Sequence, residues 1–593
     1  MDLSQQSIHD VIHPTAAFSG PVGPSDRTTT TTKLTTSIAT PNAHNNDRNS
    51  DGGIAWSESS LNPKNRIDSL DPLAKPLWRI DGCTAFGTQI YAVPLFLDPI
   101  RPYRVDVFIP EPATLPEELR KVLDLDVTFY VRDGSRIAQL GITRHVLRIL
   151  QHWTLAMDDP TQIYKNLPFG SRIAFQNLPK NVAETRISVA PTHYLEHQLL
   201  SVSTLHKFWG DKVRLPPTVD IEDIEYLSQL HDSVCLVNID GKTWIFKAIT
   251  SYTKYLYHEL RQLLVMPPHP NVIARPVHLV TKRCSFGNKV AVVGFTVENH
   301  VHGSLRDLIP FLQLHGQVSL ADKAKWSLQL ASALLHLREK SRIFYPDLRL
   351  DNIVLSESWD AVMIDFEQRG VWCEFAAPEV NAIEYIRLLA IDDEIDPKIQ
   401  ARYADLLTDL LPGWEEMGEG EDYVWPSRGY NVPWSCLTEK EHEACEVYML
   451  GRVLWCIFEA CSAPQRAAVW LSYRWEPLVE FPNYTTTPAP LRDLIDRCTR
   501  GRQPGLTKYI VRERDRLVMR DLENTGKSTA QQVQRTARDW WAKEIAASES
   551  WLQARSEGMR RGDWNENYYN RPTLREVCRA LEAFSADAGF AAK

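Results

Sequence analysis

The sequence predicts an α+β protein with more than one domain, and three observations lead to this. The first 70 residues are polar, with an unbroken run of Thr at 28–32, so they cannot bury a core and are expected to form a disordered tail. From 73 to 202, apolar strand-like segments separated by turns precede a helical segment, which is typical of a small α+β accessory domain. From 218 to 590, short apolar strands are followed by longer helical runs.

The accessory domain is predicted from its strand pattern. Arg132-Asp133-Gly134-Ser135 has the residues of a hairpin tip between two apolar segments. Strands are expected at 90–97, 103–109, 127–131 and 137–140, followed by a helix at 144–157. No group of side chains typical of a catalytic site occurs in this part of the sequence, which therefore assigns it no function.

Three oxygen-bearing side chains adjoin short apolar runs in the second half of the chain. Asn352 leads into the apolar residues 353–355, and Asp365 follows the apolar residues 362–364, while Asp347 precedes both. A loop, a strand, a turn and a second strand are expected to bring the three to one end of a hairpin. Mg²⁺ is usually held by such oxygens together with nucleotide phosphates, and a separate Asp can accept the proton of an attacking hydroxyl. The pattern favours phosphoryl transfer.

A lysine interrupts an apolar strand upstream of these residues. Lys247 lies within the segment 243–249, and a Lys in such a place usually extends to solvent or meets an anion. Glu259, in the helical run 252–266, is the expected partner. The order of these segments along the chain favours an ion pair between the two side chains.

In order and spacing, these segments resemble the protein-kinase family, in a divergent and atypical form. The resemblance implies a bilobal fold over about residues 218–590, with an N-lobe at 218–298 and a C-lobe at 303–590. It also implies two inserts in the C-lobe, at about 380–445 and 503–570.

The resemblance implies catalytic and metal-binding roles for the central motif. Asp347 falls on the catalytic base, and Arg349 stands where a positive charge steadies the γ-phosphate. Asn352 and Asp365 fall on the ligands of Mg²⁺.

The resemblance also implies an ATP site. Lys247 and Glu259 are expected to position the phosphates of the nucleotide, and backbone groups near the residues that follow the last N-lobe strand are expected to hold the adenine edge. The other nucleotide-binding residues implied in this way are Val234, Glu298, His300 and Val354.

Two further matches concern the frame of the helical part. Ala377-Pro378-Glu379 and Arg571-Pro572-Thr573 resemble segments that the family joins by an ion pair, so a buried Glu379–Arg571 pair is expected. Glu446 stands where the central C-lobe helix of the family has Asp. Its carboxylate is expected to accept backbone N–H groups of the catalytic loop.

The chain departs from the family in several places. The hairpin at 227–234, expected to cover the phosphates, contains no Gly, although bare backbone approaches phosphate most closely. Ile245 narrows the adenine pocket, and Tyr345 and Pro346 replace the usual His and Arg. The segment 365–379 has no Ser, Thr or Tyr, so activation by phosphorylation within it is not expected.

Three functions remain compatible with this pattern. The leading one is ATP-dependent phosphoryl transfer to Ser or Thr hydroxyls of a protein. The first alternative is a pseudokinase scaffold with weak or no nucleotide binding, which the Gly-free hairpin and Ile245 favour. The second is a small-molecule phosphotransferase, because Asp365-Phe366-Glu367 resembles the metal turn of aminoglycoside- and choline-kinase-like enzymes. The Ala-Pro-Glu and Arg-Pro-Thr segments favour the protein kinase.

Both inserts are expected to contain helices. The first has a helical run at 382–411 and then an acidic loop at 415–422, and the second has a helix at 529–558. An apolar stripe on this last helix is expected to pack on the C-lobe, with a partner-binding helix as the alternative. The stripe consists of Val533, Ala537, Trp541 and Ile545.

Composition narrows the partners and the compartment. The net charge is −9 and no basic tract is studded with aromatic residues, so nucleic acid is not an expected partner. No apolar run approaches the roughly 20 residues of a membrane span, and the N-terminus lacks the layout of a secretory signal. Ten Cys without paired C-x-x-C spacing indicate a reducing, intracellular location, with the cytoplasm expected and the nucleus left open. The expected partner is a protein substrate or another partner protein, and the oligomeric state is left open.

Overall fold

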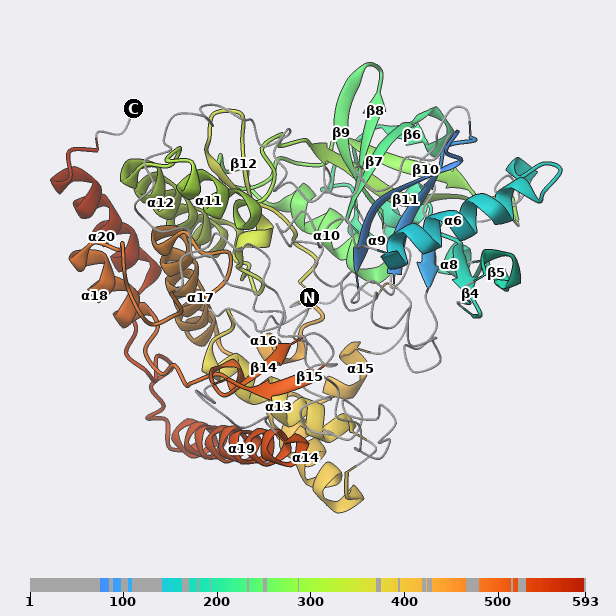
Figure 1. Cartoon of the computed structure of the whole chain (residues 1–593). Coiled ribbons are helices and arrows are strands. Elements are labelled where there is room, and N and C mark those ends of the chain that lie inside the picture. The colour runs from blue at the N-terminus through green and yellow to red at the C-terminus, as the bar shows by residue number, and fades with distance from the viewer. Residues whose placement is uncertain are drawn as a thin grey trace, which may run out of the picture.

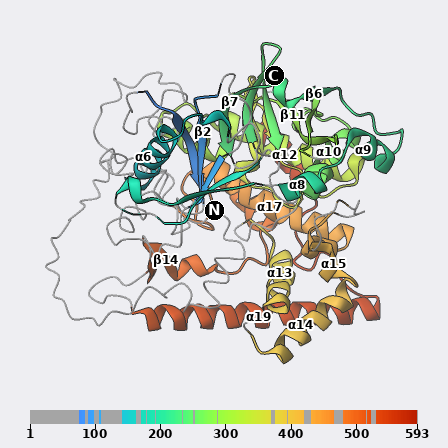
Figure 2. The ribbon, with the colours of Figure 1, turned by 90° about the vertical axis from the view of Figure 1, so that its right-hand side faces the viewer.

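The computed structural model has a mixed α+β architecture, in agreement with the class expected from the sequence (Figures 1 and 2). In Figure 1 the two larger sheets lie on the right, and most of the helices lie on the left and along the bottom. The expected tail at 1–70 and the expected hairpin at 127–140 lie outside the described residues. The structure describes residues 75–84, 89–97, 105–108, 141–162, 170–177, 179, 181–191, 193–231, 234–248, 253–285, 287–368, 375–392, 395–418, 423, 429–464, 479–513, 516–520 and 529–590.

The N-terminal sheet has five strands in the order of the chain, and one helix packs against it. The expected strands at 90–97 and 103–109 correspond to its second and third strands, and the expected helix to α6 (Gly141–Leu155). Trp78 and Ile80 from the sheet meet Ile149 from the helix in a core of their own. The strands are β1 (Trp78–Thr84), β2 (Gln89–Pro94), β3 (Val105–Phe108), β4 (Arg172–Phe175) and β5 (Ile187–Ala190).

Two short helices, α8 (His193–Gln198) and α9 (Val202–Trp209), connect the N-terminal sheet to a second sheet. Ser201 begins α9, because its side chain accepts a hydrogen bond from the backbone N–H of Thr204. The second sheet has six strands. In spatial order they are β6 (Thr218–Asp220), β10 (His278–Arg283), β11 (Val290–Glu298), β9 (Lys242–Ala248), β8 (Val234–Ile239) and β7 (Glu225–His231).

The six-stranded sheet has two apolar faces, as the alternation along β9 shows. Phe246 and Ala248 pack into the core that includes Val93 of the N-terminal sheet, whereas Ile245 packs toward α10 (Thr253–Val265). Successive side chains of a strand point to opposite faces. Lys247 therefore faces α10.

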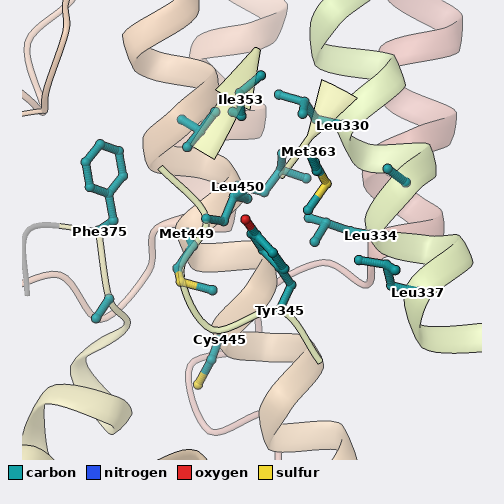
Figure 3. Packing of buried hydrophobic residues seen from close by; sticks show 14 of the residues in the cluster. Leu330, Leu334, Leu337, Tyr345, Ile353, Met363, Phe375, Cys445, Met449 and Leu450 are labelled. Carbon is teal, nitrogen blue, oxygen red and sulfur yellow. The ribbon is translucent and has the colours of Figure 1, made fainter. Parts of the chain in front are cut away.

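The helical region surrounds a short hairpin, and its large core continues into α9, α10 and one face of the six-stranded sheet. Tyr345 is fully buried in it, and Figure 3 shows this residue between Leu334 on one side and Met449 and Leu450 on the other. The elements are α11 (Leu305–Leu314), α12 (Leu320–His336), β12 (Ile353–Leu355), β13 (Ala361–Met363), α17 (Glu439–Glu459), α18 (Ala489–Cys498) and α20 (Leu574–Asp587).

Three of these helices begin with the same local device. Ser319, Thr438 and Thr573 each accept a hydrogen bond from the third helical residue, whose side chain accepts one from the cap backbone in return. Such capping boxes satisfy backbone donors that the first turn leaves unpaired. They fix where α12, α17 and α20 start.

The first insert differs from its prediction in two ways. The run expected as one helix at 382–411 forms two, α13 (Pro378–Ile391) and α14 (Pro397–Leu410), because Asp396 caps a new helix and Pro397 opens it. The start of the expected acidic loop at 415–422 belongs to a short helix, α15 (Trp414–Gly418), which is followed by α16 (Val432–Ser435).

The second insert contains the hairpin β14 (Ile510–Glu513) and β15 (Arg516–Met519), and then the long helix α19 (Ala530–Arg561). The apolar stripe on α19 packs within the chain, but largely on the inserts: Val533 and Ala537 are buried against Ile510 of the second insert, and the ring of Trp541 lies 4.8 Å from that of Tyr385 on α13. Ile545 packs against the large core, as the stripe was expected to do. Both views show α19 running along the bottom of the molecule beside α14 (Figures 1 and 2). Across the described stretches of the chain, no helix has the length and apolar character needed to cross a membrane.

Candidate active site

Lys247 lies at the centre of three carboxylates. Its Nζ is 2.6 Å from Glu259 Oε2, 2.7 Å from Asp365 Oδ1 and 3.1 Å from Glu367 Oε1. The expected ion pair with Glu259 is thus present, and Asp365 joins it from the end of the β12–β13 hairpin. These four residues are called the Lys247 cluster below.

In the Lys247 cluster one positive charge compensates three carboxylates that repel one another. Burial alone would lower the pKa of Lys247, but Asp365, Glu259 and Glu367 more than reverse this and raise its pKa well above the usual value. Burial raises the pKa of Glu259, and Lys247 opposes that shift. We infer that the ammonium form of Lys247 is what allows three carboxylates to share one buried place.

Glu259 also fixes the backbone at the turn after the hairpin. Its Oε1 accepts a hydrogen bond of 3.0 Å from the N–H of Phe366, whose buried ring lies 5.1 Å from that of Tyr345. Asp365 has a positive φ of 64°, which is uncommon for a residue other than Gly. Residues other than Gly that surrounding contacts hold in such a backbone conformation are frequent at functional sites.

The helix that carries Glu259 is held from behind by segments distant in sequence. The hydroxyl of Tyr257 donates to the carbonyl of Val292 at 2.8 Å and accepts from the N–H of Leu200 at 2.7 Å. The ring of Tyr423 lies 5.7 Å from that of Tyr257, and its hydroxyl accepts a hydrogen bond of 2.9 Å from Trp209 Nε1. The first insert and α9 therefore support α10 together.

The strand behind Lys247 is placed by one glycine. Gly294 on β11 lies opposite Ala248 on β9. A side chain at position 294 would collide with the backbone carbonyl of Lys247 and with the ring of Phe246. The two strands can run side by side here because residue 294 has no Cβ.

Asp347 forms the second part of the site. Its Oδ2 accepts a hydrogen bond of 2.9 Å from Asn352 Nδ2, and its Oδ1 lies 3.2 Å from Arg349 Nε. Asn352 in turn is joined to the Asp365 strand, because its carbonyl accepts from the N–H of Ile364 at 3.0 Å. The hairpin thus brings Asp347, Asn352 and Asp365 to the same end, as expected.

The side chain of Asp347 is mostly buried, with 22% of it exposed. Burial raises the pKa of Asp347 to about 6; Arg349 opposes this shift, and the charge of Asp365 adds to it. A carboxylate with such a pKa is ionised at neutral pH and is a stronger base than an ordinary Asp.

Arg349 belongs to a short row of alternating charges. Asp351 lies 2.7 Å from Arg306 Nη1, and Arg306 and Arg349 together hold the pKa of Asp351 well below its usual range against the effect of burial. Arg306 comes from α11, which lies beside the loop. The positive charge next to Asp347 is therefore anchored to the helical region.

The loop before Asp347 is tied to the central helix α17. Glu446 Oε1 accepts a hydrogen bond of 2.8 Å from the N–H of Tyr345, as expected, and the side chain of Arg338 lies 3.5 Å from Glu446 Oε2. Burial raises the pKa of Glu446 to about 7, and Arg338 and the Tyr345 N–H oppose it. The extra methylene of Glu, compared with Asp, does not prevent the backbone contact.

The other residues expected at a nucleotide site lie on three segments. Val234 begins β8 directly opposite Lys247 on β9, so the two side chains share one face of the sheet. Val354 is partly buried on β12. Glu298 is the exposed end of β11, and the carbonyl of His300 accepts a hydrogen bond from the N–H of Gly303 in the following turn. None of the four is a member of the Lys247 cluster, and Val234 is the one that lies opposite Lys247 in the sheet.

A divalent cation has two possible sets of ligands. Glu259, Asp365 and Glu367 offer oxygens within 4.8 Å of one another, but the Lys247 ammonium already lies among them. The second set is the one expected from the sequence, Asn352 with Asp365: Asn352 Nδ2 donates to Asp347, which leaves the amide oxygen of Asn352 as the atom able to bind a cation.

The expected pair between Glu379 and Arg571 is present and buried. Arg571 Nη1 and Nη2 donate to Glu379 Oε1 and Oε2 at 2.8 and 3.0 Å, and the two side chains are 0% and 4% exposed. Arg571 Nη1 also donates to the carbonyl of Ala444 at 3.0 Å. One side chain therefore joins α13, α17 and the segment before α20.

Sequence reasoning missed two of these contacts. Glu367 entered the sequence analysis only as part of the turn that resembles small-molecule phosphotransferases, although its carboxylate completes the Lys247 cluster. Its place two residues after the predicted metal ligand Asp365 was the available signal. The Arg306–Asp351 pair had no signal, since charged residues on helices and loops are usually solvated.

Comparison with protein-family models gives no match to this chain, and comparison with the curated proteins gives none either.

Proposed function

We propose that the chain is a divergent protein kinase that transfers the γ-phosphoryl group of ATP to Ser or Thr hydroxyls of a protein. In this proposal the six-stranded sheet with α10 is the N-lobe of a bilobal fold, and the helical region is the C-lobe. The observation that carries it is the convergence of Lys247, Glu259 and Asp365 from three separate elements, next to the Asp347–Asn352 pair.

Each side chain then has a defined task. Lys247, oriented by Glu259, binds phosphate oxygens, and the oxygens of Asn352 and Asp365 bind Mg²⁺. When bound, Mg·ATP brings the phosphoryl group, and the metal neutralises part of its charge. Asp347 accepts the proton of the substrate hydroxyl, and Arg349 holds the developing negative charge near the acceptor.

The protein substrate is favoured over a small molecule by the frame of the helical region. Glu379 and Arg571 form the buried pair that the resemblance associates with a platform for protein substrates. A buried bidentate pair of this kind is costly to desolvate, so a gain in stability alone does not explain its presence. Ordering the segment that precedes α13 is such a reason.

A nucleotide-free scaffold is the second candidate, and Glu367 is the observation that favours it. Its carboxylate is within 3.1 Å of Lys247 and adds a negative charge where phosphates would have to bind. If this charge and the Gly-free hairpin keep nucleotide out, the same fold acts only as a binding module.

A thermal-shift titration with Mg·ATP tests the proposal, because a ligand that binds only the folded state raises its stability. The proposal expects a rise in melting temperature that increases with nucleotide concentration. Asp347→Asn should then keep the shift but lose turnover, since a base acts on the chemical step. A wild-type protein that shows no shift at millimolar Mg·ATP is the scaffold instead.

A further inference from the structure

Two side chains of the N-terminal sheet reach the edge of the six-stranded sheet. Asp81, whose side chain is 1% exposed, accepts a hydrogen bond of 2.7 Å from the backbone N–H of Gln229 and one of 3.0 Å from the hydroxyl of Tyr226. Arg79 holds the same carboxylate with Nε and Nη2 at 2.5 and 3.0 Å. The pair therefore connects β1 to β7 through a buried carboxylate.

The contact falls where the ladder of β7 is irregular. β7 is an edge strand, and its register with β8 shifts between Tyr226 and Ser228 and again between Gln229 and His231. Arg79 Nη2 donates to the carbonyl of Leu227, the residue within the first shift, at 2.9 Å. Arg79 and Asp81 thus supply one donor and one acceptor to backbone groups that a further strand would otherwise pair.

The same edge leads into the hairpin that borders the Lys247 cluster. Val234, at the start of β8, is opposite Lys247, so any displacement of the β7–β8 hairpin moves the wall of the site. This hairpin has no Gly between 227 and 234, and therefore cannot rely on bare backbone to approach a phosphate. Its position is set by the pairing of β8 with β9, to which Arg79 and Asp81 add contacts along the outer strand β7.

We propose that Arg79 and Asp81 are positioning residues of the nucleotide site. Through them the N-terminal sheet holds the β7–β8 hairpin in the position, relative to Lys247, in which the phosphates of ATP can bind. This inference rests on the proposed function and gives the N-terminal sheet a role in it. It also explains why the carboxylate of Asp81 is buried beside a partly exposed Arg79. A buried carboxylate is a poor source of stability compared with apolar packing, whereas the directed contacts of the pair to Leu227 and Gln229 fix one position of the hairpin.

The test compares variants of the full chain. Asp81→Ala should raise the KM for ATP about tenfold with little change in kcat, because a lost positioning contact of about 1.4 kcal/mol acts on nucleotide binding. Asp81→Asn keeps an oxygen for the Gln229 N–H and should restore most of the affinity. Hydrogen exchange at the Gln229 amide should accelerate in Asp81→Ala and less in Asp81→Asn, and this readout needs no nucleotide.

Gln151→Ala is the matched control. Gln151 binds the backbone of Leu77 and Lys75 and fastens α6 to the start of β1, so its loss loosens the N-terminal sheet without removing a contact to β7. The inference expects an unchanged KM for ATP in this variant. If Asp81→Ala and Gln151→Ala raise the KM equally, or if neither does, the inference is overturned and the proposed function stands. A wild-type protein that binds no Mg·ATP overturns both.

Discussion

Asp347 shows how a single position couples burial to reactivity. Burial raises the pKa of Asp347 to about 6, and in the proposed reaction this residue is a general base, which is active only in its ionised form. We therefore expect log(kcat/KM) to fall with a slope of one as the pH drops below about 6, and to be level above it. A profile measured at subsaturating ATP and substrate checks this; a midpoint near pH 4 would mean that the environment of Asp347 does not shift it.

The same shift has a consequence for stability, with the opposite sign to that of a salt-bridged Asp. The pKa of Asp347 is raised in the folded state, so the group binds its proton more tightly there than in the unfolded chain. Its contribution to stability is present below the unfolded value near 4 and is lost as the pH rises through about 6. Melting curves of wild type and Asp347→Asn should be measured from pH 4 to 7. Over this interval the melting temperature of wild type should fall relative to that of the variant.

Glu367 is the residue whose substitution best distinguishes the two candidate functions, a kinase and a nucleotide-free scaffold. Replacing it by Gln removes one negative charge from the Lys247 cluster and keeps the size of the side chain. Affinity for Mg·ATP should increase about tenfold, equivalent to about 1.4 kcal/mol of relieved repulsion. Calorimetric titration measures it.

The control for Glu367→Gln is Glu357→Gln, an identical change of charge at an exposed position in the β12–β13 turn, where affinity should not change. An affinity that stays the same in Glu367→Gln would show that its carboxylate moves away from Lys247 when nucleotide binds.

At the scale of elements, α10 depends on contacts that come from other parts of the chain. Tyr423→Phe keeps the ring that meets Tyr257 but leaves Trp209 Nε1 without its acceptor. A buried donor left unpaired costs about 1–3 kcal/mol, so the melting temperature should fall and hydrogen exchange along α10 should accelerate.

Tyr194→Phe, at a side chain that is 48% exposed, provides the control and should leave both measurements unchanged. Equal behaviour of the two variants would mean that Tyr423 only fills space beside α10.

The sequence predicted some of the helices, strands and their contacts, but not all of them. The strand with Lys247, the helix with Glu259 and the hairpin between Asn352 and Asp365 follow from periodicity and from charged residues set in apolar runs. The support of α10 by Tyr423 could not be predicted, because an aromatic residue in an acidic loop carries no sign of its partner. The break between α13 and α14 was available in Asp396-Pro397, whose cap and first-turn chemistry was overlooked.

At the scale of the whole molecule, Arg571 joins segments that are far apart in the chain. Arg571→Met would leave the carboxylate of Glu379 buried without a partner, and such a change costs roughly 3–5 kcal/mol. We expect urea unfolding of this variant to begin at clearly lower concentration than in wild type.

A double variant with Glu379→Gln tests the pairing itself. It should lose less stability than the sum of the two single variants, because the second change removes the uncompensated charge. Strict additivity would show that the two side chains act independently.

The contact between the two sheets marks the limit of prediction at this scale. Patterning separated a small α+β segment from the rest, and charged residues in order along the chain led to the Lys247 cluster and to the Glu379–Arg571 pair. That Asp81 would bind the backbone of Gln229 could not follow from the sequence, since one carboxylate in a strand fits many partners equally well. Which backbone group Asp81 meets depends on how the folded surfaces of the two sheets fit together, and a sequence pattern does not give the shape of those surfaces.

Gly294 is a position at which even a small substitution is expected to disturb the Lys247 cluster. A single methyl group there would press on the peptide that carries the lysine, although residue 294 bears no reactive atom. Inactivation by Gly294→Ala would thus look like damage to the chemistry while arising purely from crowding behind it.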